Sequence, residues 1–110
     1  MITHNVDSMN QELVVQIPGD LLSSNVAEIS GQINEIKTNP NNFGGGNWKT
    51  LTLDLCKARM VDSIGLNMLV SLIKDMKSRG GNLKVVITSK TVYRTFLATR
   101  LDKLINVVLK

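Results

Sequence analysis

The sequence of 110 residues has few of the side chains on which most catalytic and metal sites depend. It contains one cysteine, Cys56, and one histidine, His4, so no disulfide can form within the chain. A triad with a histidine base, or a site of His and Cys metal ligands, would have to use these two residues alone. Because Cys56 ends an apolar stretch, we expect a buried and inert thiol. The sequence therefore predicts a protein that is not an enzyme and holds no metal or cofactor.

Long apolar segments and aromatic side chains are also scarce. No apolar run reaches the roughly 18 residues that a membrane span requires, and the N-terminus lacks the basic and then apolar pattern of a secretion signal. One Trp, one Tyr and two Phe offer little surface for stacking on bases. The net charge of +4 is a mild excess that does not by itself identify an acidic partner. We expect a cytoplasmic protein with no membrane insertion and no direct contact with nucleic acid.

The sequence does contain a regular alternation of strand and helix patterns, over a length that suits one domain of residues 1–110. Strands are predicted at Ile2–Val6, Leu13–Ile17, Thr50–Leu55, Leu83–Thr88 and Leu104–Leu109. Helices are predicted at Asn25–Lys37, at Asp62–Arg79 and after Ser89, and the Asn- and Gly-rich segment 39–48 is predicted to be a long loop. This order favours a small α/β sandwich with about three helices. Its sheet is expected to be mixed and mostly parallel, with four to five strands and an antiparallel N-terminal pair.

The helix predicted at Asp62–Arg79 has apolar residues on two sides. At 100° per residue, one stripe is expected to pack on the sheet: Leu66, Leu69, Val70, Ile73 and Met76. A second stripe, made of Ile64, Met68 and Leu72, falls on the opposite side, where a surface helix is normally polar. The pattern leaves two interpretations open. Either the buried face is wide, or the second stripe docks a partner, with Met68 as an adaptable contact.

The start of this helix combines an acidic residue with a serine. Asp62 is a natural N-cap, since its carboxylate can accept a hydrogen bond from a free backbone amide of the first turn. Ser63 follows in the first turn, where its hydroxyl can face solvent and where the helix dipole tolerates a phosphate. A plain helix cap explains the same two residues, and the pattern alone favours that simpler interpretation.

Several segments together resemble the STAS domain, the fold of bacterial anti-sigma factor antagonists. Asp54-Leu55, Asp62-Ser63-Ile64-Gly65-Leu66 and Gly80-Gly81 match the core pattern of that family in order and spacing. Upstream, Pro18-Gly19-Asp20-Leu21 is similar to the Gly-Glu-Leu segment that ends the family's second strand. Downstream, Thr99-Arg100-Leu101-Asp102-Lys103-Leu104 resembles the Thr-Gly-Leu-Asp-x-Leu segment before the last strand. The resemblance extends from about Leu13 to Val108.

The resemblance implies a binding protein controlled by phosphorylation at Ser63, with Asp62, Gly65 and Asp20 as neighbours of the site. In this family a serine kinase, usually itself the anti-sigma factor, adds the phosphate, and a PP2C-type phosphatase removes it. The unphosphorylated form binds the anti-sigma factor and releases its target. The resemblance also favours the docking interpretation of Ile64, Met68 and Leu72. Lys57 and Arg59 lie just ahead of the serine and are expected to help present it to an acidic partner surface or to a nucleotide-bound kinase.

A second function within the same fold is a subunit of another assembly, such as a signalling scaffold or a transporter-associated adaptor. We expect a monomer when the protein is free. The sequence departs from the family pattern in four places. Leu22 stands where an acidic residue is usual, and the loop 39–48 is lengthened. Arg100 replaces a glycine, which is expected to change the turn before the last strand. The final helix common in the family is expected to be absent or truncated.

Overall fold

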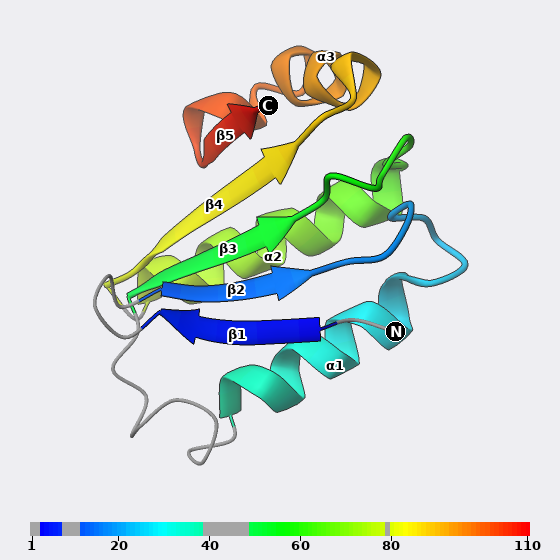
Figure 1. The fold of residues 1–110 in the computed structure, drawn as a ribbon. Helices are drawn as coiled ribbons and strands as arrows, with labels where there is room; N and C mark the ends of the chain where they lie inside the picture. The colour runs from blue at the N-terminus through cyan, green and yellow to red at the C-terminus, as the bar shows by residue number, and fades with distance from the viewer. Residues whose placement is uncertain (1–2, 8–11, 39–48, 79) are drawn as a thin grey trace.

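The computed structural model describes residues 3–7, 12–38, 49–78 and 80–110. The predicted loop 39–48 lies outside the described residues, as do Ile2 and Arg79 at the ends of two predicted elements. The elements follow the predicted order (Figure 1): β1 (Thr3–Asp7), β2 (Glu12–Gln16), α1 (Val26–Thr38), β3 (Thr50–Asp54), α2 (Ser63–Ser78), β4 (Asn82–Ile87), α3 (Lys90–Ala98), the 3₁₀ turn η2 (Leu101–Lys103) and β5 (Asn106–Leu109). The prediction of an α/β fold with four to five strands and about three helices is confirmed, since the described part of the chain has five strands and three α-helices.

The five strands form one mixed sheet in the order β1-β2-β3-β4-β5. The pair β1 and β2 is antiparallel, and the other neighbours are parallel, with Leu53 aligned between Val15 and Val85. Each parallel connection moves one strand further in the same direction through a helix. Right-handed crossovers of this kind place their helices on one face of the sheet. Figure 1 shows α2 passing behind the strands with α1 beside it.

The hydrophobic core lies between the sheet and these helices. Alternate strand residues, such as Leu13 and Leu53, are fully buried and form one cluster with Phe96 of α3. Burying a side chain of this size contributes about 1.5–3 kcal/mol. Val86 is also buried but lies outside the cluster, because successive residues of a strand point to opposite faces. The core therefore packs α2 against one face of the sheet. This packing fixes the direction of the first turn of α2.

The prediction that Met68 and Leu72 form an exposed docking stripe is wrong. Both side chains are buried, with Met68 only 6% exposed, and both belong to the core cluster. The reason is that α1 packs beside α2, so the buried face of α2 extends past the side that meets the sheet. Only Ile64 of the stripe is at the surface, with 47% of its area exposed. The alternative of a wide buried face is the correct one.

The turn before β5 contains the only non-glycine residue with positive φ among the described residues, Arg100, at φ 61° and ψ 20°. A glycine would adopt this left-handed conformation without strain, whereas other L-residues rarely do. Arg100 therefore adopts a conformation that favours glycine, and the change of turn relative to the family stays a prediction. After it, the amides of Leu104 and Ile105 donate to the carbonyl of Leu101 at 2.9 and 3.0 Å and lead the chain into β5.

Arg100→Gly should be more stable than Arg100→Ala, because both remove the same side chain but only glycine relieves the left-handed strain. Relief of that strain stabilises the glycine variant by about 1–2 kcal/mol. The greater conformational freedom of glycine in the unfolded chain offsets about 0.4–1 kcal/mol of this gain. We expect a net difference of about 0.5–1 kcal/mol in the free energy of unfolding, measured by urea denaturation. Equal stability of the two variants would show that the turn relaxes around alanine.

Candidate functional site

The loop between β3 and α2 is fixed to the chain that follows β2. The carboxylate of Asp20 accepts hydrogen bonds from the amides of Arg59 and Met60, at 2.7 and 3.2 Å. Leu21 pairs with Val61 as an isolated parallel bridge, in which Leu21 donates to the carbonyl of Met60 at 3.1 Å. Asp20 therefore acts on the site by holding the backbone of this loop. Its place next to the serine stays a prediction.

Asp62 caps α2, as the sequence predicts. One oxygen of its carboxylate accepts from the amide of Gly65 at 2.9 Å, and the other accepts from the amide of Ser23 at 2.7 Å. The hydrogen bond from Gly65, followed by the one from Ser23, lowers the pKa of the Asp62 carboxyl below its ordinary value. The carboxylate is therefore ionised at neutral pH, and its two oxygens join the helix start to the segment before α1. The bond to Ser23 had no signal in the sequence.

Gly65 allows the start of α2 to approach Leu21 closely. A Cβ atom at position 65 would lie 2.5 Å from the carbonyl oxygen of Leu21, a distance that side chains do not tolerate. The same oxygen accepts a hydrogen bond from the amide of Asp62 at 3.1 Å. Close packing against Leu21 therefore requires the glycine of the Asp-Ser-x-Gly pattern, which is the third residue of α2.

Ser63 is the first residue of α2, and its side chain is exposed. Two large apolar side chains are exposed close to it in the chain, Met60 at 58% and Ile64 at 47%. Met60 was not among the residues predicted from the sequence, although it is the one apolar long side chain between Arg59 and the cap. We call Met60, Ser63 and Ile64 the serine surface. It combines a hydroxyl with two exposed apolar side chains that are close to it in the chain.

Lys57 and Arg59 are exposed on the same loop. Together with residues at the end of β4 and the start of α3, among them Thr88 and Ser89, they line a hollow of about 660 Å³. Ser89 caps α3 by accepting from the amide of Val92. The loop therefore presents two positive charges just ahead of the serine surface in the chain.

The prediction of a buried Cys56 is only partly correct, because this side chain is partly exposed. Burial and the neighbouring Asp54 carboxylate raise the pKa of the Cys56 thiol, which keeps it protonated and poorly nucleophilic at neutral pH. In the described part of the chain, no three His, Cys, Asp or Glu side chains gather where they could hold a metal ion. Across the same residues, no helix combines the length and the hydropathy needed to cross a membrane.

Comparison with known proteins identifies both a family and similar folds. The family model of the STAS domain matches residues 2–110. A protein of Thermotoga maritima, assigned as an anti-sigma factor antagonist, has a similar structure, with a TM-score of 0.80 and 20% identity over 100% of this chain and 87% of that one. An anti-sigma factor antagonist of Mycobacterium paratuberculosis gives a TM-score of 0.74, again at 20% identity over 100% of this chain and 87% of the other.

A third similar structure is that of the anti-sigma factor antagonist SpoIIAA in its unphosphorylated form. Its TM-score is 0.63 at 14% identity, over 94% of this chain and 97% of that one. At these levels of identity the three structures establish a common fold.

Gly65→Ala should destabilise the protein, although alanine normally favours a helix. The added methyl group would push against the carbonyl of Leu21, and overpacking of this kind costs about 1–3 kcal/mol. Gly31→Ala is the matched control, because a Cβ at Gly31 in α1 meets nothing within 4 Å and should stabilise by up to about 1 kcal/mol. Thermal unfolding of the two variants measures both effects. A Gly65→Ala protein as stable as the parent would contradict the close approach.

Proposed function

The chain belongs to the STAS domain family, and on that premise we propose that it is a non-catalytic anti-sigma factor antagonist switched by reversible phosphorylation of Ser63. The observation that supports this most is the position of Ser63. Its side chain is exposed at the first residue of α2, directly after a cap whose carboxylate is engaged by two backbone amides. A hydroxyl held in this way is accessible to a kinase without any unfolding of the helix.

A phosphate at this position would change the chemistry of the serine surface. It adds about −1.5 to −2 units of charge at neutral pH, next to the Asp62 carboxylate, which is already ionised. The oxygens of Asp62 occupy the amides of Ser23 and Gly65, so the phosphate is directed outward toward solvent. A surface with two exposed apolar side chains, Met60 and Ile64, would become strongly anionic. Burying a charged phosphate against an apolar partner surface is costly. A partner that binds the unphosphorylated form through apolar contacts would therefore bind the phosphorylated form weakly.

The proposed partners are an anti-sigma factor with serine kinase activity and a PP2C-type phosphatase, both in the cytoplasm. The unphosphorylated form would bind the anti-sigma factor through Met60 and Ile64 and so release the target of that factor. Met68 and Leu72 are not proposed as contacts, because both are buried in the core. Lys57 and Arg59 are exposed on the adjoining loop and would meet acidic groups of the partner.

Incubation with ATP and the serine-kinase anti-sigma factors of the same genome should add one phosphate, located at Ser63 by mass spectrometry. Ser63→Ala should remain unmodified and keep binding the anti-sigma factor, whereas Ser63→Glu should bind at least tenfold more weakly in a titration. Ser30→Glu, at an exposed position of α1, is a control for added charge alone. Modification of other residues with Ser63 untouched, or equal binding by Ser63→Ala and Ser63→Glu, would refute the switch.

A pair of lysine substitutions on α2 separates docking from folding. Ile64→Lys places a charge on the exposed serine surface and should weaken anti-sigma factor binding at least tenfold with little change in Tm. Met68→Lys replaces a core side chain and should lower the free energy of unfolding by at least about 2 kcal/mol. Calorimetry of folding and of binding on both variants gives the two quantities. Unchanged binding by Ile64→Lys would remove Ile64 from the interface.

A further inference from the structure

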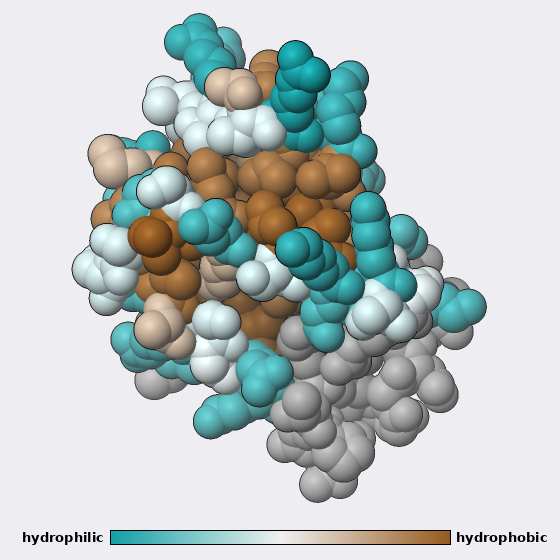
Figure 2. Space-filling view, turned by 180° about the vertical axis from the view of Figure 1, so that it is seen from behind, coloured by the Kyte–Doolittle hydropathy of each residue, from teal (hydrophilic) through white to brown (hydrophobic). Residues whose placement is uncertain are grey.

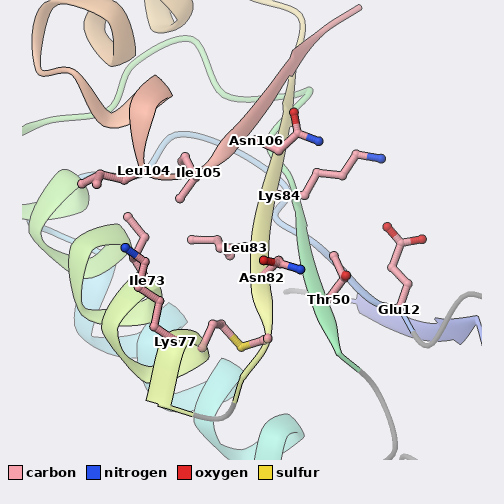
Figure 3. A pocket seen from close by; sticks show the side chains of 12 residues that line it. Glu12, Thr50, Ile73, Lys77, Asn82, Leu83, Lys84, Leu104, Ile105 and Asn106 are labelled. Carbon is pink, nitrogen blue, oxygen red and sulfur yellow. The ribbon is translucent and has the colours of Figure 1, made fainter.

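A notch opens at the edge of the sheet, at the end of α2 that is far from Ser63. The strand β4 begins at Asn82, but β5 begins at Asn106, which is aligned with Lys84. The first two residues of β4, Asn82 and Leu83, therefore have no partner in β5. Residues around this gap line a cavity of about 480 Å³ (Figure 3).

The two walls of the notch differ in chemistry. On the α2 side of β4 the wall is apolar, formed by Ile73, Leu83, Leu104 and Ile105. Leu104 projects from it with 51% of its surface exposed, although it lies among buried neighbours. Apolar side chains gather on this face of the molecule in Figure 2, which views it from behind the sheet. The notch thus has a preformed apolar contact that no described residue covers.

On the other side of β4 the wall is polar, and Lys84 and Glu12 point away from α2 in Figure 3. Lys77, in the last turn of α2, stands at the rim. Within the described part of the chain, neither lysine forms an ion pair. Glu12 is the only carboxylate of the lining, and it is already engaged by the hydroxyl of Thr52. The notch therefore carries two lysines against one carboxylate, so its own residues leave a net positive charge.

The backbone at the notch is oriented toward an incoming chain. Asn82 donates its amide to the carbonyl of Lys49 on the β3 side at 2.9 Å. Because successive residues of a strand direct their amides to opposite neighbours, the N–H of Leu83 points toward the β5 side, where the notch lies. An extended peptide in this position continues the line of β5 and alternates its side chains between the two walls.

We propose that the notch binds an extended segment of a partner protein in which large apolar residues alternate with Asp or Glu. The period of two in a strand would turn the apolar side chains to Leu104 and Ile73 and the carboxylates to Lys84. Lys77 lies fourteen positions after Ser63 in α2, about 21 Å at 1.5 Å per residue, so this surface is separate from the serine surface and does not depend on the proposed switch.

The test is a titration of the full chain, labelled with ¹⁵N, with a six-residue peptide of alternating Leu and Asp. Peptides of alternating Leu and Lys and of alternating Ser and Asp are the controls for charge and for apolar contact. We expect the amide signals of Lys77, of Asn82–Lys84 and of Leu104–Asn106 to shift with the Leu and Asp peptide, and its binding to be at least tenfold tighter than that of either control.

Matched variants locate the contacts. Lys84→Glu should weaken binding of the Leu and Asp peptide at least tenfold, whereas Lys74→Glu, an exposed lysine of α2 outside the notch, should not. Leu104→Ser should weaken it at least fivefold, and Leu97→Ser, which is 43% exposed and lies elsewhere, should leave it unchanged. The ¹⁵N spectrum of each variant without peptide confirms that it is folded.

Three results would overturn the proposal. The peptide does not bind at millimolar concentration, the shifts map to the serine surface, or the notch signals change with protein concentration before any peptide is added. The last result would assign the notch to a second copy of the chain. Ser63→Glu should bind the peptide as tightly as the parent protein, so a failure of the phosphorylation switch leaves this result unaffected.

Discussion

The contact between the Leu21 carbonyl and the start of α2 is the constraint on which the rest of the site depends. This oxygen accepts the amide of Asp62 and lies where a Cβ of residue 65 would be. It can do so only because residue 65 is glycine. The contact fixes the position of the first turn of α2 relative to Leu21, and therefore the position of Ser63 in that turn. The isolated β-bridge between Leu21 and Val61 fixes Leu21 to the loop that precedes α2 as well.

Much of this arrangement can be predicted from the sequence, because local sequence patterns determine it. An aspartate before an apolar helix predicts a cap, and the alternation of strands and helices predicts the parallel sheet. The fold and the cap at Asp62 were accordingly correct. The hydrogen bond from Ser23 to Asp62, in contrast, joins residues 39 positions apart. No periodicity records such a contact, and only the packing of α1 and α2 creates it.

The error at Met68 and Leu72 has the same origin. A helical wheel gives the angle between side chains but does not give the width of the face that its neighbours bury. In this protein α2 meets the sheet on one side and α1 on an adjacent side, so Met68 is in the core while Ile64, one turn earlier, is exposed. Arg100 shows the converse case. At this position the surrounding structure holds a non-glycine residue at φ 61°, because tertiary contacts can outweigh a local preference of about 1–2 kcal/mol.

The anchoring of the helix start also decides which kind of switch the fold can support. Asp62 is tied by two amides, and the loop before it is tied by Asp20. A charge added at Ser63 meets a backbone that is already hydrogen-bonded on both sides, so a large rearrangement would have to break several of these bonds together. A change in surface charge needs no such loss. The physical effect of a phosphate would then be confined to about one Debye length, near 8–10 Å at physiological ionic strength. The notch near Lys77, about 21 Å along α2, lies beyond that range, so the two ends of the helix can act on different partners.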